Sequence, residues 1–242
     1  MANFNTHVSY AAIASGLGSV LFLQVGLITQ NEALALALVG TIGGILPDVD
    51  LRRSYPSQLL FALFGLIAAF SAVFVYENKL TVLELWVVGT VSFLIVRFPI
   101  SMLFHRFTRH RGAMHSVLVA LLCAFLTVIL VHKLFNQAPL VAWFFGLFMF
   151  FGFLVHLLLD ELYSVDFNNR RIKRSFGTAF KLVDTKSPIE ALAVISLTLV
   201  VWYFTPSAWE FWDTLTSGET YHIIASRILP EYLSSLFTGM GR

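Results

Sequence analysis

Long apolar runs separated by short polar breaks make up most of the chain. Seven such runs can be distinguished. They cover approximately residues 8–29, 33–47, 57–76, 80–104, 113–132, 138–160 and 188–206. Most of them approach the ~20 residues that an α-helix needs to cross a bilayer. The pattern therefore predicts an all-α, polytopic membrane helix bundle with about seven transmembrane segments.

Two of these segments carry residues that disturb a regular helix. The second segment is short and contains Gly40, Gly43 and Gly44, so a full crossing and a partial or re-entrant segment both remain open. Pro99 lies late in the fourth segment. Because proline lacks an N–H donor, it is expected to kink or end that helix.

The composition supports a membrane protein. Of the 242 residues, 57% are hydrophobic and 12% are charged, whereas soluble globular domains carry about 25% charged residues. No linker-like stretch interrupts the segments, so residues 1–206 are interpreted as one transmembrane domain. Residues 207–242 would form a C-terminal tail, in which the stretch 221–237 is apolar on one side and could lie as an interfacial helix. The sequence does not indicate an oligomeric state.

The distribution of lysine and arginine predicts an orientation. If every segment crosses, twelve of the 16 basic residues lie on the side of the N-terminus and four lie on the opposite side. Cytoplasmic loops are enriched in Lys and Arg, so the N-terminus is predicted to be cytoplasmic. If the second segment were re-entrant, every later segment would be inverted and the basic residues would no longer collect on one side. The charge distribution therefore favours a full crossing.

Histidines and aspartates collect on the same predicted side, at the ends of the apolar segments. They come from four separate places in the chain. These residues are His7, Asp48, Asp50, His105, His110, His115, His156 and Asp160. Only Lys and Arg were counted to predict the orientation. That these His and Asp residues fall on one side as well is therefore independent support for the topology. Ionisable residues in apolar segments are costly to bury and are functional by default.

Residue type and spacing favour a metal site at the cytoplasmic face. His156 and Asp160 are four residues apart and therefore share one helix face. After Pro47, an extended turn is expected, in which one of Asp48 and Asp50 binds directly and the other bridges or orients. The predicted ligands are His7, Asp48, Asp50, His110, His115, His156 and Asp160. Such ligands suit zinc, manganese or iron, and their number suggests two or three ions.

Other polar residues near these ligands receive supporting roles. Arg111 is predicted to contact a phosphate, because guanidinium binds phosphate through two hydrogen bonds. It is grouped with Asp48 and Asp50 as a catalytic residue. His105 and Ser116 are candidates for hydrogen bonds that orient the ligands, although His105 could also be an ordinary loop residue. The basic run at 170–174 is expected to hold a loop at the membrane surface, and no nucleic-acid partner is expected.

These motifs resemble the YdjM-like family of inner-membrane metal-dependent hydrolases, also described as LexA-binding. The matching motifs are Thr6-His7, Pro47-Asp48-Val49-Asp50, the stretch from His110 to Ser116, and the stretch from His156 to Asp160. The resemblance covers about residues 1–187 and implies a bacterial inner-membrane location. Only this resemblance raises a repressor as a partner. The order of motifs is also similar to that of the zinc-dependent phospholipase C superfamily, which implies zinc bound in an all-helical bundle.

The predicted function is a membrane-embedded, metal-dependent hydrolase. Its substrate would be a membrane phospholipid or another lipid phosphate ester, cleaved through a metal-activated water. Two alternatives stay open: hydrolysis of a lipid ester or amide, and a non-enzymatic role as a metal transporter or structural partner. Transporters hold their ligands near the bilayer midplane, so ligands at segment ends count against transport.

Overall fold

A computed structural model describes residues 3–51, 54–107, 114–166, 171–172, 181–183 and 188–228. The regular secondary structure of these residues is helical, apart from a ladder of two-residue strands. The chain divides into two compact units: unit 1 comprises Met1–Gly44 and Ser116–Arg242, and unit 2 comprises Ile45–His115. The all-α prediction is therefore confirmed. The interpretation of residues 1–206 as one transmembrane domain stays a prediction.

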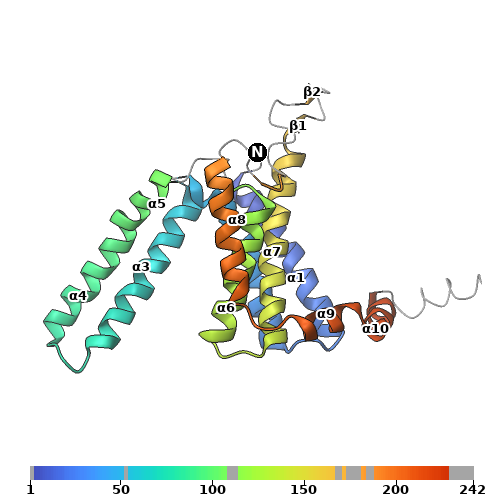
Figure 1. Cartoon of the computed structure of the whole chain (residues 1–242), viewed down its shortest axis with the longest axis horizontal. Coiled ribbons are helices and arrows are strands. Elements are labelled where there is room, and N and C mark those ends of the chain that lie inside the picture. Colours follow the sequence, from blue (N-terminus) through green and yellow to red (C-terminus); the bar gives the residue numbers. More distant parts are fainter. Residues whose placement is uncertain are drawn as a thin grey trace, which may run out of the picture. The chain divides into compact units, whose positions relative to one another are not determined.

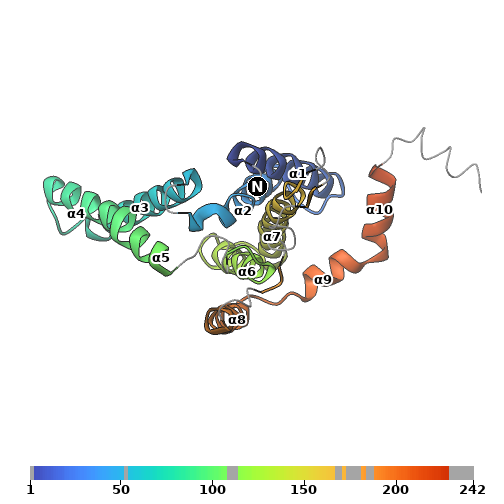
Figure 2. The same ribbon diagram turned by 90° about the horizontal axis from the view of Figure 1, so that it is seen from above.

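Unit 1 is a bundle arranged around one long helix, α7. Its helices are α1 (Phe4–Gln24), α2 (Gln30–Gly43), α6 (Val117–Lys133), α7 (Pro139–Leu162) and α8 (Pro188–Tyr203). Helix α7 packs against α1, α2 and α6, and α8 packs against α6 (Figures 1 and 2). After α7, strands β1 (Val165–Asp166) and β2 (Arg171–Ile172) pair in antiparallel fashion.

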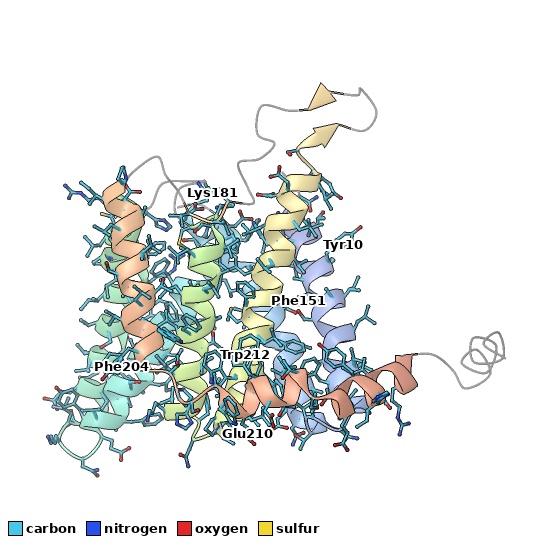
Figure 3. The ribbon with its side chains drawn as sticks, turned by 45° about the vertical axis from the view of Figure 1, so that its right-hand side comes forward. Tyr10, Phe151, Lys181, Phe204, Glu210 and Trp212 are labelled. Carbon is cyan, nitrogen blue, oxygen red and sulfur yellow. The ribbon has the colours of Figure 1, made fainter. Side chains whose placement is uncertain are left out.

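Two short helices complete unit 1 at the end of the bundle opposite the N-terminus. Helix α9 (Trp209–Thr216) lies across this end, and α10 (Gly218–Ile228) follows it (Figure 3). Both fall in the predicted tail. Of the predicted interfacial stretch 221–237, residues 221–228 belong to α10, and the remainder lies outside the described residues.

Local sequence signals fix where the first two helices begin. Helix α1 starts after Asn3, whose side chain accepts a hydrogen bond from the Thr6 N–H at 2.8 Å. Helix α2 starts with a capping box, in which Glu32 accepts from the Thr29 N–H at 2.7 Å and Thr29 accepts from the Glu32 N–H at 3.4 Å. Such contacts satisfy N–H groups that have no partner within the helix.

Helices α2 and α7 approach each other backbone to backbone. A Cβ atom on Gly43 would overlap the Met149 carbonyl oxygen, and a Cβ on Gly152 would overlap the Gly40 carbonyl oxygen. Small residues allow such close helix contacts within membranes. The contact therefore fixes the end of α2 against the middle of α7.

An aromatic cluster fills the opposite end of unit 1. The ring of Phe22 meets the rings of Phe144 and Phe148 edge-on, at centroid distances of 5.2 and 5.4 Å. Phe211 of α9 stacks on Trp143 at 5.6 Å. These contacts hold the start of α7, the end of α1 and the helix α9 in one core.

Unit 2 is built on a helical hairpin. A 3₁₀ turn, η1 (Leu46–Asp50), precedes α3 (Tyr55–Tyr76), which packs against α4 (Val82–Ile95) (Figure 1). A π-helical turn, η2 (Val96–Ile100), then leads into α5 (Ser101–Phe107).

Pro99 does not end the fourth predicted segment. It lies in the π-helical turn, and the helix continues through it, so that Val82–Arg106 forms one apolar helix of 25 residues. Pro99 has no N–H to donate, and a π-helical turn is a local change of hydrogen-bond register that lets a helix continue past such a residue.

Each predicted apolar segment contains a helix. Among the described residues, four helices are long and apolar enough to cross a membrane, and Val117–Lys133 and Pro188–Tyr203 are shorter apolar helices. The four are Phe4–Gln24, Tyr55–Tyr76, Val82–Arg106 and Pro139–Leu162. The prediction of a polytopic helix bundle is confirmed. The count of seven crossings and the cytoplasmic N-terminus stay predictions.

Within unit 1, the helix ends alternate as the predicted topology requires. Helices α1, α6 and α8 start at one end of the bundle, and α2 and α7 finish there (Figure 1). Two contacts at that end document the arrangement: His7 of α1 meets Asp160 of α7, and Ser116 bridges to Lys181.

The glycine contact between α2 and α7 can be tested by substitution. We expect Gly152→Ala to destabilise the protein by about 1–3 kcal/mol, because the added methyl group overpacks a backbone contact. Thermal unfolding of the detergent-solubilised protein measures this effect. Gly16→Ala is the matched control, since a Cβ there meets nothing within 4 Å. Equal melting temperatures for the two variants would contradict the close approach.

Candidate functional site

The first His/Asp group lies in unit 1, where the start of α1 meets the end of α7. His7 stands in the first turn of α1, and His156 and Asp160 stand in the last two turns of α7. His7 is 2% exposed, and the other two are fully buried. One ligand atom from each of the three lies within 4.8 Å of the other two.

Asp160 lies beside the Nε2 edges of the two imidazole rings. Its Oδ1 lies 3.3 Å from His7 Nε2, and its Oδ2 lies 4.0 Å from His156 Nε2. The two rings are stacked, with centroids 3.7 Å apart and planes at 14°. Each carboxylate oxygen therefore faces the Nε2 atom of a different histidine.

A hydrogen bond to the backbone sets the tautomer of His156. Its Nδ1 lies 2.8 Å from the Gly44 carbonyl oxygen. A carbonyl can only accept, so Nδ1 carries the hydrogen and the Nε2 of the neutral ring carries a lone pair. Histidines that bind metals commonly donate their other N–H to a backbone carbonyl in this way. The Gly44 contact therefore presents Nε2 of His156 toward Asp160 as a potential ligand.

The geometry of this group fits a metal ion. Two ligands of a tetrahedral zinc ion, each about 2.0–2.2 Å from the metal, lie about 3.4 Å apart, close to the 3.3 Å between His7 Nε2 and Asp160 Oδ1. Among the described residues, His7 Nδ1 has no hydrogen-bond partner although it is buried. Two imidazoles and a carboxylate match the ligand preference of zinc and related ions. An ordinary buried ion pair is the other chemistry that these three residues allow.

The second His/Asp group lies in unit 2. His115 is fully buried, with Nε2 at 3.8 Å from Asp48 Oδ1 and Nδ1 at 3.7 Å from Asp50 Oδ2. Both distances exceed the usual 2.7–3.2 Å of a hydrogen bond. The side chain of Asp50 is buried, whereas that of Asp48 is 21% exposed. Asp48 is therefore the carboxylate of this group that water can reach.

The turn that carries these aspartates is not extended. Residues Leu46–Asp50 form a 3₁₀ turn with Pro47 near its start. The expectation of an extended turn is wrong, because the fixed φ of proline suits the first turn of a helix. The helical turn directs Asp48 and Asp50 to the two different ring nitrogens of His115.

A chain of hydrogen bonds holds this turn. The Ser54 hydroxyl donates to the Asp48 carbonyl at 2.8 Å, and His105 Nδ1 contacts the Asp50 carbonyl at 3.2 Å. His105 Nε2 lies 2.8 Å from Ser57 Oγ. Because the Asp50 carbonyl can only accept, Nδ1 of His105 is the donor, and in the neutral ring Nε2 accepts from the Ser57 hydroxyl.

His105 thus contacts the backbone of a predicted ligand rather than lying in an ordinary loop. Its ring also packs edge-on against Phe61, at a centroid distance of 5.8 Å. Ser54 and Ser57 were not identified from the sequence. The Ser-x-Pro pattern of Ser54 signals the start of α3, but nothing local signals its bond to Asp48.

Ser116 occupies a helix terminus. It is the N-cap of α6, and its Oγ accepts from the Val119 N–H at 3.4 Å. The Lys181 carbonyl accepts from the Val117 N–H at 2.9 Å. The backbone N–H groups at the start of α6 therefore find acceptors in the Ser116 side chain and in the segment 181–183. His110 and Arg111 lie outside the described residues, so their assignments stay predictions.

The family of the YdjM inner membrane protein matches residues 1–209. The chain belongs to this family. The match extends past residue 187, where the resemblance of the motifs ended, and it includes both His/Asp groups and all of α8. No curated protein and no solved structure matches the chain. An inner-membrane family and four long apolar helices together make this YdjM-family member a membrane protein.

The hydrogen-bond chain in unit 2 leads to a stability test. We expect His105→Phe to destabilise the fold by about 1–3 kcal/mol, because it removes the bonds to the Asp50 carbonyl and to Ser57. In His105→Asn, the amide N–H can replace Nδ1–H, so a smaller loss is expected. Thermal unfolding in detergent compares the two variants. If His105→Asn were the less stable of the two, the assigned donor would be wrong.

Proposed function

We propose that this YdjM-family protein is a metal-dependent hydrolase that cleaves a phosphoester bond in a phospholipid or another lipid phosphate. The observation that carries the proposal is the buried group of His7, His156 and Asp160. It lies at the end of α7, a helix long and apolar enough to span a membrane. Divalent metal ions are the cofactors expected there, with zinc favoured by the ligand set.

Burial of Asp160 supports a bound cation. An ionised carboxylate removed from water is costly unless it is paired or binds a metal. Asp160 is fully buried, and its two oxygens face the Nε2 atoms of two imidazoles. Since the Nε2 of His156 presents a lone pair in the neutral ring, a cation between that atom and the carboxylate would favour the observed arrangement.

The group in unit 2 can supply a second binding site of the same chemistry. Asp48, Asp50 and His115 offer two carboxylates and one imidazole. When bound, divalent ions lower the pKa of a coordinated water and offset the negative charge that develops on phosphate oxygens. Asp50 and His115 would hold the ion, and the more exposed Asp48 would accept the proton of the attacking water. Arg111 would bind the phosphate.

A lipid substrate is supported by the surface beside the first group. The last two turns of α7 bury His156 and Asp160, yet they expose Leu158 and Leu162. Acyl chains can therefore approach the same helical turns that carry the ligands. Orientation of this end toward the cytoplasm follows from the distribution of basic residues and is part of the proposal.

Two other functions use the same residues. Hydrolysis of a lipid ester or amide needs the same metal-activated water and differs only in the bond cleaved. Metal transport would need ligands near the middle of a span, whereas His7, His156 and Asp160 occupy helix ends. The phosphoester is favoured because Arg111 follows directly on the predicted ligand His110.

Metal content tests the first step of the proposal. Protein purified without chelator should contain stoichiometric transition metal, measured by elemental analysis. Asp160→Asn and His156→Ala should each lower that content, because they remove a ligand. His132→Ala is the control: this histidine lies in the last turn of α6, and its Nδ1 contacts the Gln137 carbonyl at 2.8 Å. A wild-type protein without transition metal would falsify the proposal.

The reaction itself can be assayed with phospholipids in mixed micelles. We expect release of phosphate or a phosphorylated headgroup, reduced by about 10–100-fold or more by Asp160→Asn, since even residues that only orient metal ligands cost that much when they are mutated. Release of fatty acid instead would favour the ester alternative. Metal flux into proteoliposomes that His156→Ala abolishes, without lipid turnover, would establish transport and exclude the hydrolase.

A further inference from the structure

Helix α9 is fixed to unit 1 by one face. Phe211 is buried and stacks on Trp143, with its ring also 5.9 Å from the ring of Phe144. Leu215, one turn later, packs against the same aromatic cluster. Helix α9 lies across the end of the bundle (Figure 3), and the rest of its surface lies outside this aromatic contact.

That remaining surface divides into an aromatic part and an acidic part. Trp209 and Trp212 are 80% and 59% exposed, and their spacing of three residues places them on one face. Glu210 and Asp213 are also exposed and share another face. At 3.6 residues per turn, the two faces are about 100° apart, and the acidic face points about 150° away from Phe211 and Leu215. Figure 3 shows Trp212 on the side of α9 toward the bundle and Glu210 on the opposite side.

We infer that α9 is an interfacial helix, which inserts Trp209 and Trp212 among bilayer lipids and keeps Glu210 and Asp213 in water. Trp and Tyr prefer the boundary between hydrocarbon and water. The apolar surface continues from α8 into α9, because Trp202, Tyr203 and Phe204 are exposed where α8 ends. This continuity with the surface of an apolar helix favours lipid, rather than a second protein, as the material that covers the two tryptophans.

The end of the bundle sets the level of this interface. Helix α7, a candidate membrane span, starts here, and α8 ends here. A helix that lies across this end of the bundle would lie in the plane of the bilayer surface. Its acidic face then points to water, which avoids the cost of burying carboxylates.

Charge distinguishes α9 from amphipathic helices that bind anionic lipids. Such helices carry Lys or Arg on their polar face, whereas α9 carries no basic residue between Trp209 and Thr216. Insertion would therefore depend on apolar and aromatic contact instead of attraction to anionic headgroups. The inference does not rest on the proposed hydrolase function, because it uses only the end of unit 1 that lacks the His/Asp group.

Spin-label accessibility in proteoliposomes tests the inference on the full chain. Cys123, the sole cysteine, is replaced by alanine, and a nitroxide is attached at Trp212→Cys or at Glu210→Cys. Oxygen partitions into lipid, whereas a nickel chelate stays in water. The label at 212 should collide mainly with oxygen, as should a reference label at Phe204→Cys. The label at 210 should collide mainly with the nickel chelate, as should one at Asn78→Cys in the α3–α4 turn.

The lipid composition provides a second readout. In phosphatidylcholine vesicles with and without phosphatidylglycerol, the accessibilities at 212 should be the same, since α9 has no basic residue. Nickel access at 212 equal to that at 78 would overturn the inference by placing Trp212 in water. Exclusion of both reagents from 212 would also overturn it and would indicate a protein partner. Trp209→Cys repeats the test at the second tryptophan and serves if the 212 variant does not fold.

Discussion

Direct backbone contact between α2 and α7 is the constraint on which the first His/Asp group depends. Without side chains at Gly43 and Gly152, the end of α2 reaches the backbone of α7. That approach brings the Gly44 carbonyl to 2.8 Å from His156 Nδ1. The carbonyl then decides which nitrogen of His156 carries a hydrogen, and so which one faces Asp160. A packing feature of the helix interface thus controls the chemistry of a side chain.

The two His/Asp groups obtain their order by different means. In unit 1, long helices hold His7, His156 and Asp160, and packing fixes the side chains. In unit 2, Asp48 and Asp50 lie on a short turn whose carbonyls are held by Ser54 and His105. Rigid elements position ligands more accurately than loops do. The hydrogen bonds from the N-cap of α3 and from α5 therefore give the turn the order that its own length would not provide.

Periodicity in the sequence was sufficient to predict much of this architecture. Apolar runs located every helix from α1 to α8, and the i, i+4 spacing placed His156 and Asp160 on one face. To predict that His7 lies near Asp160, the topology was needed as well, since no local sequence pattern connects α1 with α7. Other features depend on tertiary contacts that leave no local signal. Ser57 and His105 are 48 residues apart in the sequence, yet they form a hydrogen bond. Pro99 lies in a π-helical turn, and the residues on either side of that turn have an ordinary helical sequence pattern.

Helix α7 carries aromatic packing at its start and ligands at its end. Trp143 stacks on Phe211 of α9. His156 lies 13 residues later in α7, which is about 20 Å along the helix axis from Trp143. If α9 lies at one bilayer surface, the length of α7 would fix the distance between that surface and the ligands. A bilayer with longer or shorter acyl chains would then shift the opposite headgroup layer relative to the ligands. Membrane thickness would in this way regulate which part of a lipid molecule meets His156 and Asp160.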